Sequence, residues 1–270
     1  SAITPEIDFI RIGSELSCDI PFRSHLIENV LESCSSRREV HACIERCRVF
    51  VGTVSTFSSK TELFRLKTFD VAIVDEATQI LEPQLLGLLC ARNVAGGNAI
   101  GKFILIGDHK QLPAVVLESQ SEVCEDCLHS IGLHNLKDSL FERLYRNSAD
   151  TTHHLSLITN RSYDMLCRQG RMNVEVARFP NHAFYGGLLE PVGLQHQQGE
   201  LTLAPGLEND EFADILVRRV VFLASVPEVA SQSAKINHFE AQLVARLAAA
   251  IYRQYDGTSG FRPALTLGII

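Results

Sequence analysis

The stretch Phe69–Gln79, which reads FDVAIVDEATQ, constrains the fold more than any other part of the chain. Its apolar run, Val71–Val74, is short and ends abruptly at two adjacent carboxylates, Asp75 and Glu76. A continuous apolar run is typical of a strand buried on both faces, as in a parallel sheet covered by helices. Because ligands of such sheets bind at the carboxyl ends of the strands, we expect the two acids to lie at the edge of a site.

Two adjacent acids at a strand end can take different roles in a reaction at a phosphate group. Successive side chains of a strand point to opposite faces, so one carboxylate can face a Mg²⁺-bound phosphate while its neighbour faces an attacking water. Mg²⁺ usually binds through one or two carboxylates together with substrate phosphates. The alternative is a strand followed by the acidic N-terminus of a helix, where carboxylates interact favourably with the helix dipole.

A second stretch, Lys102–Ala114 (KFILIGDHKQLPA), repeats the pattern. Phe103–Ile106 predicts another buried strand, and Gly107 and Asp108 follow it before a polar turn that is closed by a proline. Ligands of parallel sheets bind beyond the strand ends at one edge. Two buried strands that both end in an acid therefore indicate one shared nucleotide site.

DEATQ followed downstream by GDxxQLP resembles motifs II and III of superfamily 1 helicases, in the group that contains the nonsense-mediated-decay RNA helicase and its DNA-processing relatives. The resemblance covers nearly the whole chain, because further segments are similar to that family in the same order. These are Arg48–Thr56 at motif Ib, Ser139–Leu144 (SLFERL), Gln169–Met172 at motif IV, Phe184–Leu188 (FYGGL), and Asn237, Glu240 and Ala241 at the entry to a helix.

The resemblance implies an α/β fold of the P-loop NTPase type, with two RecA-like lobes whose parallel sheets are flanked by helices and with ATP between the lobes. Residues 1–150 would form lobe 1 with motifs Ib, II and III, and residues 151–270 would form lobe 2 with motif IV. Both lobes are expected to be incomplete, because neither the phosphate loop nor the later motifs are found. The chain is therefore expected to be an internal fragment of a longer helicase.

The resemblance also implies roles for the residues of motifs II and III. Asp75 would hold Mg²⁺ through water, and Glu76 would orient and deprotonate the attacking water. Gln111 would sense the γ-phosphate and couple hydrolysis to lobe movement, with Asp108 supporting that loop and Gln79 contributing to nucleotide binding. Phosphoryl transfer depends mainly on positioning and electrostatics, so loss of Glu76 is expected to lower the rate by orders of magnitude.

Arg171 is the candidate arginine finger of the second lobe, because a planar guanidinium can bind phosphate oxygens bidentately. The surrounding segment, Gln169–Met172, departs from the family at Gly170, where the family has a tyrosine placed to pack near the nucleotide. This departure puts tight packing of the base in doubt. Without the flanking match, a surface arginine would be the better interpretation of Arg171.

The segment Arg48–Thr56 (RVFVGTVST) predicts a strand that ends in a Gly-Thr turn. In the resembled family this is motif Ib, which lies near the nucleic-acid path. Thr53, Ser55 and Thr56 are therefore candidate donors, from a loop, to the phosphates of single-stranded DNA or RNA. The alternative for each hydroxyl is an ordinary polar exit from a strand.

Gly96–Lys102 (GGNAIGK) nearly matches the phosphate loop G-x-x-x-x-G-K-[ST]. The next residue is Phe103, so the hydroxyl that would hold Mg²⁺ is missing. The segment also precedes a predicted strand, whereas a phosphate loop follows a strand and opens a helix. We interpret it as a glycine-rich surface loop.

A group of zinc-type ligands follows, with Cys124, Cys127, His129 and His134 close together. Zinc fingers separate their ligand pairs by about a dozen residues, and here the second pair begins two residues after the first. The apolar positions of residues 123–131 instead favour an amphipathic helix.

Composition limits the class of protein. The formal net charge of −7 argues against nucleic-acid binding by the bulk surface, although single strands can be held in a local groove. No apolar run is long enough to span a bilayer and no secretory signal opens the chain, so we expect no membrane partner. Eight cysteines in a chain of this size then indicate reduced thiols in the cytoplasm or nucleus. The oligomeric state is not indicated.

We therefore expect an ATP-dependent nucleic-acid helicase or translocase that uses ATP and Mg²⁺ and moves along single-stranded DNA or RNA, with the fragment inactive alone. The alternative is a degenerate helicase-like binding or assembly module without ATP turnover.

Elsewhere the sequence predicts helices over 82–92 and 240–252, strands over 10–13, 155–158, 220–224 and 264–270, and a surface excursion over 195–207.

Overall fold

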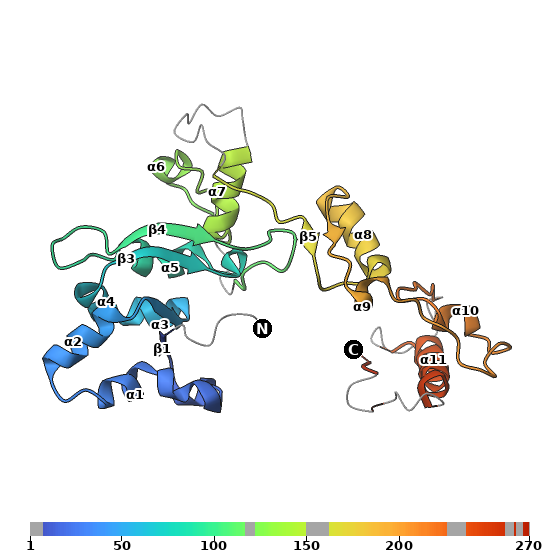
Figure 1. The fold of residues 1–270 in the computed structure, drawn as a ribbon. Coiled ribbons are helices and arrows are strands. Elements are labelled where there is room, and N and C mark those ends of the chain that lie inside the picture. Colours follow the sequence, from blue (N-terminus) through green and yellow to red (C-terminus); the bar gives the residue numbers. More distant parts are fainter. Residues whose placement is uncertain are drawn as a thin grey trace. The chain divides into compact units, whose positions relative to one another are not determined.

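The computed structural model describes residues 8–116, 122–149, 162–225, 236–256, 262 and 267–269. The chain forms two compact units, residues 1–164 and residues 165–270, and Figure 1 labels most of their helices and strands. The predicted boundary at residue 150 lies outside the described residues. The predicted strand over 155–158 and most of the predicted strand over 264–270 also lie outside them.

The first unit alternates short strands with helices. In chain order its elements are β1 (Phe9–Ile12), η1 (Glu15–Ser17), η2 (Ile20–His25), α1 (Ile27–Glu32), α2 (Arg37–Arg46), β2 (Val49–Gly52), α3 (Val54–Ser59), α4 (Thr61–Leu66), β3 (Phe69–Val74), η3 (Ala77–Gln79), α5 (Glu82–Leu89), β4 (Ile100–Leu105), α6 (Asp126–His129) and α7 (Leu140–Ala149). The strands expected near residue 10 and over Phe103–Ile106 and the helix expected over 82–92 are therefore confirmed, with slightly different ends.

All strand pairs of the first unit are parallel, as the sequence predicts. β1 pairs with β2 from Phe9 opposite Val49, and β3 pairs with β4 from Phe69 opposite Ile100. Within the described residues these are two separate two-stranded sheets. Parallel pairing places the carboxyl ends of β3 and β4 at one edge, which is the arrangement that a ligand site of an α/β fold needs.

A hydrophobic core forms on one face of the β3–β4 pair, against α5. Leu85 and Leu88 lie three residues apart on one side of α5 and are buried, whereas Leu86 is half exposed. The buried members of this core are Phe64, Val74, Ala77, Leu85, Leu88, Ala99, Ile100 and Leu140. The core therefore holds the acid-ended β3 strand against α5 and α7.

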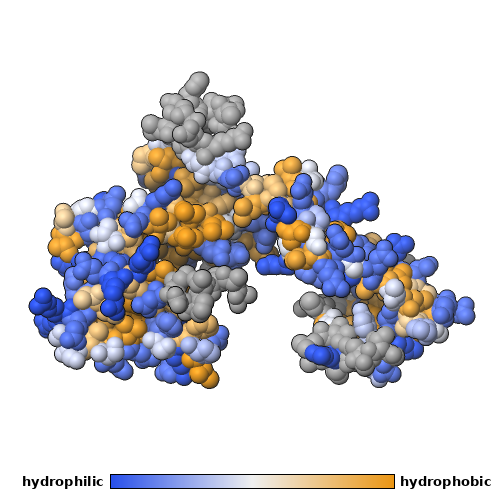
Figure 2. Space-filling view, in the orientation of Figure 1, coloured by the Kyte–Doolittle hydropathy of each residue, from blue (hydrophilic) through white to orange (hydrophobic). Residues whose placement is uncertain are grey.

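The opposite face of the β3–β4 pair is exposed, so the prediction that these strands are buried on both faces is wrong for this structure. Val71 and Ile73 of β3 are 43% and 66% exposed, and Ile104 of β4 is 40% exposed. Figure 2 shows apolar surface in the region of these strands. Among the described residues no helix covers this face, whereas α5 packs on the opposite face.

Helix α7 is fixed to α5 by a buried ion pair. Arg143 Nε and Nη2 donate to the two carboxylate oxygens of Glu82, and both side chains are nearly buried. Ser139 precedes this helix, and its hydroxyl accepts a hydrogen bond from the backbone N–H of Glu142 at 3.1 Å, as an N-cap side chain does. Hydrogen bonds from Arg146 to Asp138 and Glu142 raise the pKa of Arg146 further above its ordinary value.

The second unit contains β5 (Arg168–Gln169), α8 (Val174–Tyr185), β6 (Glu190–Pro191), α9 (Gln195–Gln198), α10 (Ala213–Leu216) and α11 (His238–Asp256). β5 and β6 are parallel. α8 ends at Gly186, whose φ of 59° is the left-handed conformation that glycine adopts without steric cost. The predicted helix over 240–252 is confirmed and is longer, and its Asn237 side chain accepts from the N–H of Glu240 as expected of an N-terminal feature.

Helices α10 and α11 share a small core, and two ion pairs, Arg246–Glu211 and Arg253–Asp210, join α11 to the chain just before α10. Ala250 of α11 packs with Phe212 and Leu216. Asp210 accepts from the N–H of Phe212 and from Arg253, and these two hydrogen bonds, in that order, lower the pKa of Asp210. The long C-terminal helix is thereby tied to the chain that precedes it.

Two expectations about secondary structure are wrong. Residues 220–224 form no strand, no described segment pairs with them, and Phe222 is 91% exposed. The helix expected over 123–131 shrinks to the four residues of α6. The surface excursion expected over 195–207 is mostly exposed, and it also contains helix α9, whose Gln197 is fully buried. In the parts of the chain that are described, no helix has the length and apolar character needed to cross a membrane.

Candidate functional site

The carboxyl ends of β3 and β4 are joined by backbone hydrogen bonds that extend past both strands. The N–H of Ile106 donates to the carbonyl of Val74 at 2.8 Å, and the N–H of Ala77 donates back to the carbonyl of Ile106 at 2.8 Å. Asp75 and Glu76 occupy the two positions between these bonds. The structure therefore brings the acids of DEATQ to the point where the GDHKQLP segment leaves the sheet.

Glu76 has an unusual backbone conformation. Its φ of 52° and ψ of 38° are left-handed, and no other non-glycine residue in the described part of the chain has a positive φ. This conformation costs about 1–2 kcal/mol for an L-residue and is often retained at functional sites. The Asp75 carboxylate accepts from the N–H of Glu76 at 3.0 Å, and the Gln79 amide donates to the Glu76 carboxylate at 3.0 Å. Asp75, Glu76 and Gln79 thus form one exposed cluster.

Gly107 holds the two motifs in close contact. A Cβ atom at this position would lie 3.0 Å from the backbone nitrogen and from Cγ2 of Thr78, which is closer than side chains normally approach. Thr78 is itself buried. The glycine of GDHKQLP is therefore required by the approach of the DEATQ segment, and not by a turn of its own.

The loop that follows is organised by Asp108. Its carboxylate accepts from the N–H of Lys110 at 2.9 Å and from the side-chain amide of Gln111 at 3.0 Å. The ring of His109 lies 4.4 Å from the ring of Tyr145 in α7, a contact that the sequence did not indicate. Asp108 and Gln111 are thus paired in a loop that is anchored on α7, next to the cluster of Glu76.

The side chains at this edge fit a magnesium ion that is bound mainly by the phosphates of a substrate and by water. Asp75 is exposed, and one exposed carboxylate suits Mg²⁺, which keeps several waters and binds substrate phosphates. Among the described residues no group of three or more His, Cys, Asp or Glu side chains could hold a metal ion. At the cysteine–histidine segment, His129 Nε2 instead lies 2.6 Å from the carbonyl of Val123.

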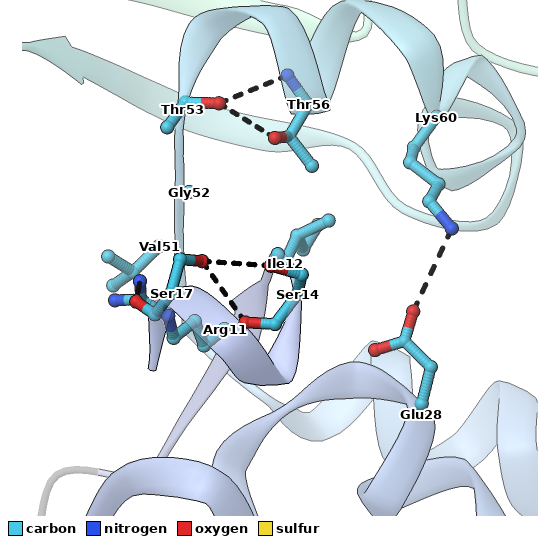
Figure 3. Close-up of a pocket in the computed structure, with 11 residues that line it drawn as sticks. Arg11, Ile12, Ser14, Ser17, Glu28, Val51, Gly52, Thr53, Thr56 and Lys60 are labelled. Carbon is cyan, nitrogen blue, oxygen red and sulfur yellow. Dashed lines mark hydrogen bonds and ion pairs between the residues drawn. The ribbon is translucent and has the colours of Figure 1, made fainter. Parts of the chain in front are cut away.

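A pocket of about 620 Å³ lies at the carboxyl ends of the other parallel pair, β1 and β2 (Figure 3). Two cations border it, Arg11 from β1 and Lys60 from the end of α3, and Lys60 is 3.9 Å from the carboxylate of Glu28. The Nε atom of Arg11 is buried without a hydrogen-bond partner among the described residues. The polar and charged side chains that line the pocket are those of Arg11, Ser14, Ser17, Glu28, Thr53, Thr56 and Lys60.

The hydroxyls predicted to contact nucleic acid do not lie in a loop, and that part of the prediction is wrong. Thr53 is the N-cap of α3 and accepts from the N–H of Thr56, while Ser55 and Thr56 lie in the first turn of the helix. The hydroxyl of Thr53 also bonds the hydroxyls of Thr56 at 2.7 Å and Ser55 at 3.2 Å. The N-cap preference of threonine explains why the helix begins directly after the strand. Thr53 and Thr56 line the pocket, and Ser55 does not.

Arg171 lies in the second unit, in the loop between β5 and α8. The side chain of Gln169 folds this loop, because its carbonyl oxygen accepts from the N–H groups of Arg171 and Met172 and its amide donates to the carbonyl of Met172. The Arg171 side chain is exposed and makes no ion pair with any described residue. Its guanidinium is therefore available to an anionic group.

Sequence reasoning missed the residues that hold this loop from outside. Gln197 of α9 donates to the carbonyls of Gln169 and Met172, and the ring of His196 bonds the carbonyl of Gly170. No motif spacing links α9 to Gln169–Met172, because the two segments are separated by the whole of α8. A glutamine within an otherwise polar stretch gives no sign that it is buried.

Two family models described as AAA domain match the chain, one over residues 17–119 and the other over residues 136–270. The chain is also similar to proteins named as helicases, including "DNA replication ATP-dependent helicase/nuclease DNA2" of Mus musculus, which is 34% identical over 47% of this chain and 9% of the relative. "DNA polymerase alpha-associated DNA helicase A" of Saccharomyces cerevisiae is 31% identical over 54% of this chain and 19% of the relative. "Probable helicase MAGATAMA 3" of Arabidopsis thaliana is 32% identical over 55% of this chain and 15% of the relative. The chain thus spans less than a fifth of the length of these curated relatives.

Proposed function

Because the chain belongs to the AAA-domain family and has the sequence character of a superfamily 1 helicase, we propose that it forms part of an ATP-dependent nucleic-acid helicase or translocase. The protein that contains it would couple ATP hydrolysis to movement along single-stranded DNA or RNA, inside the cell. We also propose that this protein belongs to the nonsense-mediated-decay helicase group. It would have two RecA-like lobes that divide near residue 150.

One observation carries the proposal. Ile106 bonds the backbone on both sides of Asp75 and Glu76, so two acid-ended parallel strands meet at one exposed edge. This is the place where parallel sheets bind phosphate ligands. A site with two neighbouring carboxylates and an amide loop suits the binding and hydrolysis of a magnesium-bound triphosphate.

Each residue takes a defined role in this proposal. Asp75 holds Mg²⁺ through a water, and Glu76 accepts a proton from the attacking water. Gln111, held by Asp108, contacts the γ-phosphate, and Arg171 neutralises charge that develops on it. Gln79 fixes the carboxylate of Glu76, as its hydrogen bond suggests.

The pocket at β1 and β2 is the proposed contact with the nucleic-acid backbone. Arg11 and Lys60 supply positive charge, and the hydroxyls of Thr53 and Thr56 supply hydrogen bonds to phosphate oxygens. Such contacts bind a strand without reading its bases, which is what a protein that moves along the strand requires.

ATP hydrolysis by the full-length protein tests the proposal. We expect the rate to depend on Mg²⁺ and to rise when single-stranded DNA or RNA is added, and we expect residues 1–270 alone to show no hydrolysis. Equal rates with and without a strand would argue against translocation. Nucleotide or strand binding with no hydrolysis under any condition would instead favour a binding or assembly module, an alternative that Gly170 in place of the family tyrosine keeps open.

A further inference from the structure

We infer that Gln197 is a positioning residue for Arg171, an inference that rests on the proposed role of Arg171 at the γ-phosphate. Gln197 lies in the short helix α9 and is fully buried, which is uncommon for a glutamine. Burying an amide is unfavourable unless its hydrogen bonds are made. The partners of this amide therefore indicate what it does.

Both hydrogen bonds from the Gln197 amide nitrogen reach the loop that carries Arg171. The nitrogen donates to the carbonyl of Gln169 at 2.8 Å and to the carbonyl of Met172 at 3.2 Å. The amide oxygen accepts from the N–H of Leu194 at 3.1 Å, in the turn that begins α9. Gln197 thus connects the two ends of the Gln169–Met172 loop to a helix outside it, with Arg171 between the two contacts.

Neighbouring side chains fix the same two segments together. His196 Nε2 lies 2.9 Å from the carbonyl of Gly170, and Asn173 Nδ2 donates to the carbonyls of His196 and Gly199. Asn173 is also the N-cap of α8, where its side chain accepts from the N–H of Glu175. The backbone on both sides of Arg171 is therefore held against α9, while the side chain of Arg171 remains exposed.

Gly170 explains why an outside support matters here. A glycine contributes no side chain that could fix the loop and has more backbone freedom than any other residue. A displacement of about 1 Å in a group that stabilises a transition state can cost roughly 100-fold in rate. We therefore expect α9 to keep the guanidinium of Arg171 in reach of the phosphate, without touching the nucleotide itself.

A double-mutant cycle in the full-length protein tests this inference, with strand-stimulated ATP hydrolysis as the readout. We expect Arg171→Ala to lower kcat by roughly 1,000-fold and Gln197→Leu to lower it by roughly 10- to 100-fold, with KM for ATP changed little. Gln197→Leu added to Arg171→Ala should cause no further loss, because the positioned group is already absent. Gln198→Leu is the matched control, since Gln198 lies in the same helix, is exposed and makes no side-chain hydrogen bond to a described residue.

The outcomes separate this inference from the proposed function. An unchanged kcat in Arg171→Ala would overturn the role of Arg171, and the positioning role of Gln197 with it. A reduced kcat in Arg171→Ala together with an unchanged kcat in Gln197→Leu, or losses that multiply in the double mutant, would overturn only the role of Gln197. If the two losses multiply, Gln197 supports the folded structure in general and not the position of Arg171.

A second variant keeps the test valid if Gln197→Leu does not fold. His196 is exposed, so His196→Ala removes the hydrogen bond to the carbonyl of Gly170 without opening a buried cavity. We expect a fall in kcat of roughly 3- to 10-fold, again absent in the Arg171→Ala background. An unchanged kcat, or a fall of equal size in both backgrounds, would contradict the inference.

Discussion

At the residue scale, the site depends on the left-handed backbone of Glu76. A strained non-glycine conformation persists only where its surroundings enforce it. Here the Asp75 carboxylate binds the N–H of Glu76, and the neighbouring N–H of Ala77 is held by the carbonyl of Ile106. The left-handed conformation of Glu76 is thus held by hydrogen bonds to its own N–H and to the next one along the chain.

Replacing Glu76 with glutamine separates its chemistry from its structural role. Glutamine keeps the size of the side chain and an oxygen that can accept from Gln79, but it cannot accept a proton from water. We expect Glu76→Gln to lower kcat for ATP hydrolysis in the full-length protein by at least about 100-fold, with nucleotide binding retained. Glu62→Gln, an exposed change in α4, is the matched control. Normal turnover in Glu76→Gln would remove this residue from the reaction.

Gly170 shows the opposite case, a glycine that the backbone does not require. A Cβ atom there would lie 3.5 Å from Val192 and 3.6 Å from Leu194, which is ordinary van der Waals contact. The loop can therefore carry a side chain, and its conformation does not require glycine at this position.

At the element scale, α7 connects the loop that carries Asp108 and Gln111 to the body of the first unit. It carries Tyr145, which contacts His109 of the Gln111 loop, and Arg143, which forms the buried ion pair with Glu82. Arg143 also donates to the carbonyl of Ile131 at 2.8 Å. One arginine thus fixes α7 against both α5 and the segment that precedes α7.

Removing this arginine should destabilise the protein strongly. Arg143→Ala leaves the buried carboxylate of Glu82 without a partner, so we expect the free energy of unfolding to fall by about 3–5 kcal/mol. Arg146→Ala, which breaks the more exposed pairs with Asp138 and Glu142, should cost at most about 1 kcal/mol. Urea unfolding followed by circular dichroism measures both. Equal losses in the two variants would show that burial does not set the strength of the Arg143–Glu82 pair.

At the scale of the whole molecule, acidic residues outnumber basic ones. The chain carries a net charge of −7, so a nucleic acid is not attracted by the surface as a whole. The pocket at β1 and β2 places Arg11 and Lys60 together, with a single acid, Glu28, beside them. We expect strand binding by the full-length protein to depend on such local contacts.

The salt dependence of binding checks the contribution of this pocket. In the full-length protein we expect Arg11→Ala combined with Lys60→Ala to weaken binding of single strands about equally for all base sequences. The slope of log K against log salt concentration should become shallower by about 0.7 for each phosphate contact that is lost. Arg65→Ala, which removes an exposed cation from α4, should leave the slope unchanged. An unchanged slope in the double variant would place the strand elsewhere.

The sequence by itself determined the local features of this protein. Runs of apolar residues and helical periodicity predicted β3, β4, α5 and α11, because these signals lie between residues that are neighbours in the chain. The same spacing placed Asp75, Glu76 and Asp108 at strand ends. Only the tertiary structure decided which sheet faces are covered, that Glu76 is left-handed, and that Gln197 reaches Gln169 across 28 residues. Those features depend on contacts between distant segments, whose partners no local pattern specifies.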